Sequence, residues 1–390
     1  MKNTRKYKRK ISTTRISRKT RRLTTGGKAI GSGGFGCVFL PPVKCKKRNK
    51  KLESDKYVSK LMTKKHANAE YNTIKKIEKT LREIPNYQRY FLIVDVHKCK
   101  PGPLSSQDLI KFDKKCKPLS KHKDITSKNV NDNLQELEEL ILPDGGVTLD
   151  TYYQHMISEE NLIYINNQII DLLRNGVLPM NKLHMYHADL KETNILYNVN
   201  TYRLSIIDWG LAFKYTRGKL PSLICNKPFQ YNLPFSIILF NSKFDKSYAK
   251  FMQRYTSSPP REKWMSDLTN FVYEYIRIHN DWRGEGHFNT IMTLWSNVYT
   301  DNDPEDMITS YLVNILASFT KNGKFEREKY FQSVFLRNVD VWGTLMCYSP
   351  VLEENLYNKR EKLATIYDKY LMRTWGEPID TSMLIEDLRM

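Results

Sequence analysis

The sequence predicts an α+β fold in two parts, a β-rich amino-terminal lobe and a mainly helical carboxy-terminal lobe. Short apolar runs typical of strands lie before residue 143, at 38–40, 57–62, 90–94 and 137–142. Long patterns with helical spacing dominate after residue 159. A chain of 390 residues is long enough for two such lobes or for two domains.

The positive charge is concentrated at the amino terminus. Residues 1–52 contain eighteen Lys or Arg and no Asp or Glu, so the rest of the chain carries only +3 of the net +21. We expect residues 1–26 to form a disordered basic arm. Such an arm is either a solvated tail or a segment for contact with nucleic acid or for nuclear import.

The six cysteines are few for this length and form no CxxC pair, which predicts a reducing, intracellular compartment. No apolar run reaches 18 residues, and the charged amino terminus lacks an apolar stretch. We therefore expect neither secretion nor membrane spanning.

A glycine-rich stretch, Gly31-Ser32-Gly33-Gly34-Phe35-Gly36-Cys37-Val38, opens the first lobe at residues 27–143. Glycines let a turn bring its backbone N–H groups close to phosphate oxygens. A helix should follow the last glycine of a dinucleotide-binding fingerprint, but here a short strand and Pro41-Pro42 follow. The stretch therefore predicts a β-hairpin lid.

Lys60 lies on the predicted strand 57–62, and the alternation of a strand places it on one face with Val58 and Met62. A lysine that faces inward needs an anionic partner. Glu70 is the acid on the apolar stripe of the predicted helix 65–80, which makes it the natural partner, with Glu78 as the alternative.

Residues 97–133 are rich in Lys, Ser and Asn and contain three prolines, which predicts an inserted loop. A zinc site is a minor alternative there, although the spacing of its candidate ligands fits no compact pattern. Those ligands are His97, Cys99, Cys116 and His122.

The stretch 187–210 contains several side chains suited to metal binding and catalysis within a short span. Asp189 precedes Asn194 by five residues, and Lys191 lies between them. The apolar runs 194–197 and 204–207 predict a β-hairpin that ends at Asp208. Two carboxylates and one amide would then meet in a small site, which suits Mg²⁺ and a phosphate.

Helical patterns surround this stretch. Residues 159–183 predict a long apolar helix, residues 338–345 a buried one, and residues 352–375 amphipathic helical sequence. Within the second lobe, at residues 144–390, residues 241–330 are predicted to be an insertion of mixed helix and loop.

Taken in order, these motifs resemble the protein-kinase signature set. They are Gly31–Val38, Lys60, Glu70, His187–Asn194, Asp208–Gly210 and Asp340-Val341-Trp342. The resemblance covers residues 28–235 and 335–375, and it is closest to protein kinases encoded by large DNA viruses, whose sequences resemble residues 232–236 and the Asp-Val-Trp-Gly helix.

The resemblance implies a two-lobed kinase-like fold and an ATP- and Mg²⁺-dependent Ser/Thr protein kinase. It implies Asp189 as the base, Lys191 beside the moving phosphoryl group, and Asn194 and Asp208 as metal ligands. The implied nucleotide-binding residues are Gly31, Gly33, Gly34, Phe35, Gly36, Val38, Lys60 and Glu70. Asp340 would anchor the loop that carries Asp189, and Lys191 is typical of Ser/Thr rather than Tyr kinases.

The chain departs from the family at four places. Ala188 replaces an arginine, so control through that arginine is not expected, and Trp209 replaces a phenylalanine. An Ala-Pro-Glu motif is missing near Pro234, and the insertion precedes Asp340. None of these changes removes a group that the family uses to contact ATP.

Two other functions stay open. A catalytically inactive scaffold could recruit partners through the basic arm, although it would not need Lys60, Asp189, Asn194 and Asp208 together. A small-molecule kinase of the aminoglycoside or choline type shares the His-x-Asp…Asn…Asp pattern but not the full lid.

The expected partners are ATP, protein substrates and, through the arm, nucleic acid. The expected location is intracellular, in the host cytoplasm or virion if the protein is viral, or in the nucleus.

Overall fold

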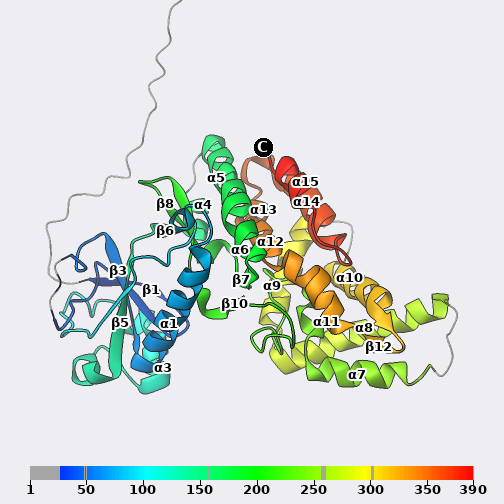
Figure 1. Cartoon of the computed structure of the whole chain (residues 1–390), viewed down its shortest axis with the longest axis horizontal. Coiled ribbons are helices and arrows are strands. Elements are labelled where there is room, and N and C mark those ends of the chain that lie inside the picture. Colours follow the sequence, from blue (N-terminus) through cyan, green and yellow to red (C-terminus); the bar gives the residue numbers. More distant parts are fainter. Residues whose placement is uncertain are drawn as a thin grey trace, which may run out of the picture. The chain divides into compact units, whose positions relative to one another are not determined.

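The computed structural model describes residues 27–47, 49, 51–155, 158–255, 261–299 and 303–389, so the predicted basic arm at 1–26 lies outside the described residues. The predicted α+β class is confirmed: the amino-terminal region contains a sheet and the carboxy-terminal region is mostly helical (Figure 1).

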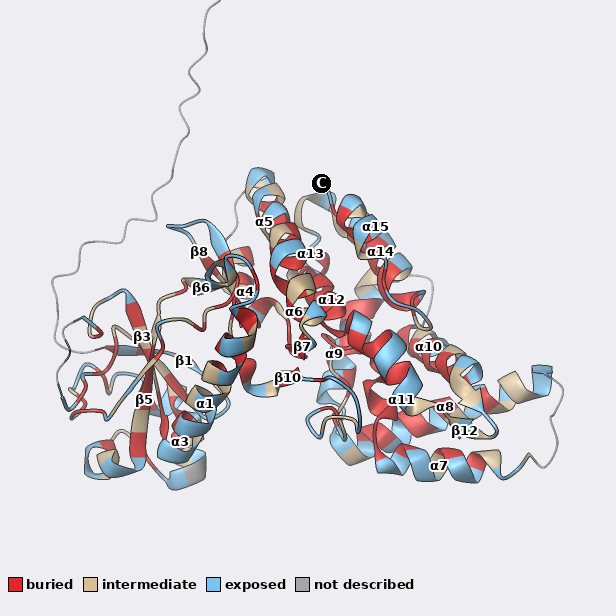
Figure 2. Ribbon diagram, in the orientation of Figure 1, coloured by how far each residue is buried: buried red, intermediate tan, exposed pale blue. Residues whose placement is uncertain are grey.

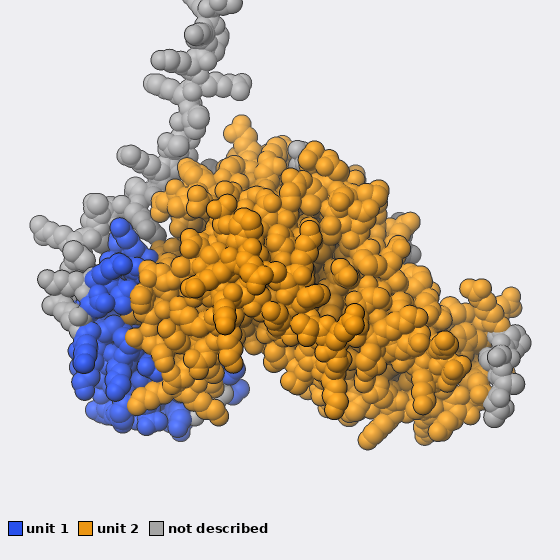
Figure 3. Space-filling model, viewed as in Figure 1, with its two compact units in different colours: residues 1–63, 99–139 blue, residues 64–98, 140–390 orange. Residues whose placement is uncertain are grey.

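The chain divides into two compact units, which differ from the predicted lobes (Figure 3). The first contains residues up to 63 together with 99–139, and the second contains 64–98 and 140–390. Helix α1 (Lys64–Leu81) belongs to the second unit because its buried Ile74, Ile77 and Leu81 join the larger hydrophobic core.

The largest sheet has five strands in the order β1-β2-β3-β5-β4. They are β1 (Lys28–Ser32), β2 (Gly36–Leu40), β3 (Tyr57–Thr63), β4 (His97–Cys99) and β5 (Leu137–Pro143). The antiparallel pairing of β1 with β2 confirms the predicted hairpin. The predicted strand at 90–94 is wrong: Phe91 forms only an isolated bridge with Ile206, and its apolar side chain is buried in the core.

The prediction of a loop at 97–133 is also wrong, because this segment contains β4, α2 (Phe112–Lys115), α3 (Lys117–Lys123) and a 3₁₀ segment (Val130–Glu136). Its Phe112, Leu119 and Ile125 share a buried core with Phe39 and Leu61 of the sheet. Burial of these apolar side chains stabilises the structure of a segment that is otherwise rich in Lys and Ser.

Two disulfides join parts of the first unit, Cys37–Cys116 and Cys45–Cys99. These bonds differ from the reduced cysteines expected from the sequence. The paired cysteines are 79 and 54 positions apart, so no short sequence motif indicated the pairing. The zinc alternative is wrong, because the sulfurs of Cys99 and Cys116 are already bonded to other sulfurs.

The second unit is built around α12 (Leu336–Met346), in which every residue except Arg337 is buried (Figure 2). The predicted helix at 159–183 is confirmed as α5 (Glu159–Leu172) and α6 (Leu178–Lys182), joined by one π-helical turn. The predicted hairpin is β8 (Ile195–Asn198) with β9 (Arg203–Ile206). Shorter elements are β6 (Val147–Thr148), α4 (Leu149–Tyr153), β7 (Met185–Tyr186) and β10 (Phe213–Lys214).

The segment at 241–330, predicted to be an insertion of mixed helix and loop, is mainly helical and also contains two short strands. It comprises α7 (Ser242–Met252), α8 (Arg261–Arg283), α9 (Gly286–Val298), α10 (Pro304–Phe319), β11 (Thr320–Lys321), β12 (Lys324–Phe325) and α11 (Arg327–Tyr330). The chain ends in α13 (Ser349–Glu353), α14 (Arg360–Tyr367) and α15 (Thr381–Asp387). Among the described residues, none of the helices combines the length and the apolar character that crossing a bilayer requires.

Candidate active site

In the first unit, the glycine-rich turn and Lys60 lie together. The N–H of Gly33 donates to the carbonyl of Gly36 (2.9 Å) and closes the turn between β1 and β2. Lys60 is opposite Val38 in the register of β2 and β3. A Cβ built at Gly33 would lie 3.4 Å from Cε of Lys60, an ordinary contact distance, so the lysine side chain lies directly beside the turn.

The other glycines of the turn differ in what they do. A Cβ at Gly36 would collide with the Leu61 carbonyl and the Met62 side chain, so this glycine lets β2 approach β3. A Cβ at Gly34 would meet no atom within 4 Å, one at Gly31 would make only an ordinary contact with Val38 (3.8 Å), and Phe35 is half exposed at the tip. The turn therefore presents backbone groups with few side chains in front of them, as a phosphate-binding turn requires.

The two candidate partners of Lys60 belong to the second unit, on α1. Glu78 is already engaged, since its carboxylate binds Lys75 (3.0 Å) and Arg82 (2.7 Å). The alternative assignment of Glu78 to Lys60 is therefore not supported. Glu70 lies half-buried two turns earlier on the same helix.

In the second unit, buried Asp340 holds the loop at residues 187–194. Its carboxylate accepts hydrogen bonds from the backbone N–H of His187 (2.9 Å) and of Ala188 (2.8 Å), and from Nδ2 of Asn181 (2.7 Å). Ala188 has φ of 53°, a conformation that costs a non-glycine residue about 1 kcal/mol. Asp340 therefore fixes a backbone that would not adopt this shape unaided.

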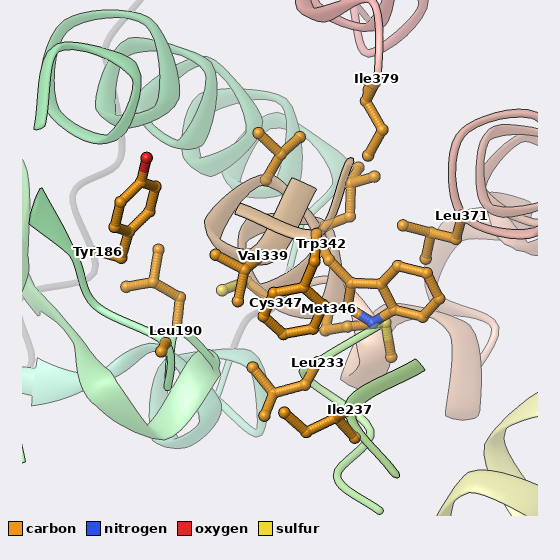
Figure 4. Close-up of a cluster of buried hydrophobic side chains, with 14 of the residues drawn as sticks. Tyr186, Leu190, Leu233, Ile237, Val339, Trp342, Met346, Cys347, Leu371 and Ile379 are labelled. Atoms are coloured by element: carbon orange, nitrogen blue, oxygen red, sulfur yellow. The ribbon is translucent and has the colours of Figure 1, made fainter. Parts of the chain in front are cut away.

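The same loop rests on the hydrophobic core. Leu190 packs beside α12, and Figure 4 shows it with Leu233, Val339 and Trp342. A Cβ at Gly343 would lie 2.7 Å from the carbonyl oxygen of Leu190, so only glycine permits this approach of helix and loop. The loop is thus positioned by both a buried carboxylate and close packing.

Asp189 is surrounded by donors and is only 8% exposed. Asn194 Nδ2 donates to its Oδ2 (2.9 Å) and to its backbone oxygen (2.8 Å), and Asn232 Nδ2 donates to its Oδ1 (3.0 Å). Lys191 Nζ lies 3.2 Å from Oδ1. The structure therefore brings three predicted site residues, Asp189, Lys191 and Asn194, into one cluster.

Asp208 follows β9 and has φ of 62°. Its carboxylate is exposed and accepts only a 3.5 Å hydrogen bond from the N–H of Gly210; it forms no ion pair with any described residue. The neighbouring Trp209 is buried against the rings of Phe91 and His187. His187 Nε2 donates to the Ile207 carbonyl (3.0 Å), and burial lowers the pKa of His187, which keeps the ring neutral.

These residues could hold a divalent ion only together with other ligands. Within the described ranges, no three His, Cys, Asp or Glu side chains gather as a metal site. A magnesium ion needs only one or two carboxylates when phosphate oxygens and water complete its shell. The unpaired carboxylate of Asp208 meets that requirement, as does Asn194 Oδ1, because the Asn194 amide nitrogen is already bound to Asp189.

Sequence reasoning missed several residues around this cluster. Asn232, which binds Asp189, lies in a stretch noted only for its resemblance to viral kinases. Tyr231 donates to the buried carboxylate of Glu192 (2.7 Å), and Trp342 Nε1 donates to the Tyr231 carbonyl (3.0 Å). These contacts hold the segment around Tyr231 and Pro234, in which no Ala-Pro-Glu motif is present, against α12 and the loop that carries Asp189.

Helix α8 holds the backbone before and after this segment. Tyr275 of α8 donates its hydroxyl hydrogen to the Ile238 carbonyl (3.1 Å), and His279 Nε2 donates to the Lys227 carbonyl (3.2 Å). Lys227 is a further residue that sequence reasoning missed. It is 8% exposed, and its Nζ meets no hydrogen-bond acceptor in the described part of the chain. Burial lowers the pKa of Lys227 to about 8, although the charge of Asp189 opposes this shift.

We expect Lys227→Met to stabilise the protein at pH 7. Below pH 8 the buried side chain is charged in both folded and unfolded chains, and the folded chain bears a cost on the order of 3 kcal/mol for the shift from 10.5 to about 8. That cost fades as the pH rises from 8 to 10.5, because the folded chain releases the proton first.

Urea unfolding at pH 7 and pH 10 tests this prediction, with the exposed Lys263 changed to Met as the matched control. The gain in free energy of unfolding should be smaller at the higher pH and missing in the control. An equal gain at both values would contradict the assigned pKa.

Comparison with known proteins adds no assignment: models of known families give no match to this chain, and a search of curated proteins finds none.

Proposed function

We propose that this chain is an ATP- and Mg²⁺-dependent protein kinase that phosphorylates Ser or Thr hydroxyls. One observation carries the proposal: Asp189 is bound by Asn194, Asn232 and Lys191 within a loop whose backbone is held by buried Asp340. A carboxylate, an amide and an ammonium group so arranged suit proton acceptance beside a phosphate.

The first unit would bind the triphosphate. The turn at Gly31–Gly36, with Phe35 at its tip, would direct backbone N–H groups at phosphate oxygens, and Lys60 beside Gly33 would bind the α- and β-phosphates. Glu70 would orient Lys60, and Val38, on the same face of the sheet as Lys60, would line the nucleotide site.

The second unit would carry out the transfer. Asp189 would accept the hydroxyl proton while the acceptor oxygen bonds to the γ-phosphorus and the bond from that phosphorus to the β–γ bridging oxygen breaks. Lys191 would neutralise charge on the moving phosphoryl group. Asn194 and Asp208 would hold Mg²⁺, which, when bound, supplies positive charge to the phosphates.

The proposed partners are ATP and intracellular proteins, with nucleic acid as the proposed partner of the basic arm. The arm's concentrated charge supports that last assignment, because phosphate backbones attract such segments.

The decisive experiment incubates the purified full chain with γ-labelled ATP, Mg²⁺ and a panel of basic and acidic proteins. We expect label on Ser or Thr, and a loss of about 10²-fold or more in Asp189→Asn, because the amide cannot accept the proton. The exposed Asp281 changed to Asn is the matched control, with expected wild-type activity.

Other outcomes would separate the alternatives. ATP binding without transfer by the wild type would favour a scaffold, and label on an aminoglycoside or choline alone would favour a small-molecule kinase. Equal activity of the wild type and Asp189→Asn would contradict the assignment of the base.

A further inference from the structure

A groove of about 890 Å³ lies in the second unit, beside the loop that carries Asp189 but lined by none of the residues that contact Asp189. Its walls come from α6 and the π-helical turn before it, from β7 and the segment after β10, from the start of α12 and the turn before it, and from α15 with the segment that leads into it. The proposed phosphoryl transfer uses none of its wall residues. The groove therefore calls for its own explanation.

The walls carry a marked excess of positive charge. Arg174, Lys182, Arg217 and Arg337 all line the groove and are exposed. None of them forms an ion pair with another described residue. The single carboxylate of the walls, Glu386, is already bound to Arg389 (2.8 Å). Four cations around one concavity raise its potential and attract an anion.

Part of the groove's lining is apolar and open to solvent, since Leu178 is half-buried and Pro378 is exposed. Tyr186, Leu336, Ile379 and Ile385 line the groove and are buried, and Figure 4 shows Tyr186 and Ile379 at the edge of the core. An inorganic anion would leave the apolar surface of Leu178 and Pro378 uncovered. The tyrosine rings do not form an exposed stacking platform for nucleic-acid bases either, since Tyr186 and Tyr215 are both buried and Tyr215 donates to the Gly218 carbonyl.

We propose that this groove docks a peptide segment of a partner protein in which Asp or Glu residues alternate with apolar ones. Carboxylates would bind the arginines, whose planar groups suit bidentate pairing, and apolar side chains would cover Leu178 and Pro378. Clusters of arginine are a recurrent means of recognising acidic motifs.

The groove adjoins the loop that carries Asp189. Tyr186 directly precedes His187, and Asn181, which also lines the groove, donates to Asp340 (2.7 Å). A docked segment would thus lie against the residues that hold this loop. On the proposed kinase function the segment belongs to a substrate, but the binding of the peptide does not depend on that function.

The test measures the fluorescence anisotropy of a short labelled peptide of Glu, Asp and Leu with the full chain at near-physiological salt. We expect affinity to fall at least tenfold in the double variant Arg174→Glu/Arg337→Glu and to weaken with added salt. Lys263→Glu, an equal reversal at an exposed site on α8, should change it little. The basic arm is present in all three proteins, so the difference between them reports the groove.

Unchanged affinity in the double variant would overturn the proposal. So would equal binding of a matched Gln and Leu peptide, or binding of single-stranded DNA at these residues in place of the peptide. A protein substrate with the acidic segment appended should show a KM at least tenfold higher with the double variant. If the kinase assay fails but the peptide still binds at the groove, only the proposed function fails.

Discussion

Asp208→Asn is expected to lower the rate of phosphoryl transfer by about 10³-fold, because it removes the main charge that would hold Mg²⁺. No cation among the described residues pairs with this carboxylate, so the fold does not depend on its charge. Asparagine tolerates the φ of 62° at this position. The melting temperature should therefore stay close to that of the wild type.

Initial rates over a Mg²⁺ titration, together with thermal melts, measure both effects. Asp281→Asn provides a matched loss of one carboxylate at an exposed position. Undiminished transfer by Asp208→Asn would remove the proposed metal site. A large fall in melting temperature would show instead that Asp208 serves the fold.

The cluster of Asp189, Lys191 and Asn194 could be predicted from the sequence because its members lie close together in the chain. All three fall within six consecutive positions, so a single loop brings their side chains together. Asp340 is 152 positions from Ala188, and only its place in a family pattern suggested that it anchors this loop.

The remaining contacts could not be predicted, because each depends on tertiary packing without a local signal. Asn232 is 43 residues from Asp189, and nothing in its neighbours distinguishes it from a surface asparagine. Lys227 looks like an ordinary solvated lysine in the sequence, yet α8 and the segment around it bury its side chain.

For the fold as well, elements with a local sequence signal could be predicted, and those that depend on distant contacts could not. The hairpin of β1 and β2 was predictable from glycines and alternation, which are local signals. The residues at 97–133 were misjudged because Phe112, Leu119 and Ile125 are too widely spaced to form a periodic pattern. Their partners, Phe39 and Leu61, lie on strands far earlier in the chain, so burial overrides the polar composition.

Asp340→Asn is expected to reduce kcat by about 10²-fold and to cost about 3 kcal/mol in the free energy of unfolding. Both carboxylate oxygens accept hydrogen bonds in a fully buried site, from His187, Ala188 and Asn181. An amide would direct N–H groups at one of these donors and leave it unsatisfied. Released from Asp340, the strained backbone at Ala188 would relax and displace the neighbouring Asp189.

Because Asp340 would position the base without touching ATP, the KM for ATP should change little while kcat falls. Thr344→Val is the matched control: this buried hydroxyl lies one turn further along α12 and donates to the backbone carbonyl of Asp340 (2.7 Å), not to a group of the loop at 187–194. We expect it to lower stability slightly and to leave kcat unchanged. If Asp340→Asn lost stability but kept its kcat, Asp340 would serve the fold alone, and the position of Asp189 would have to be set by Asn194 and Asn232.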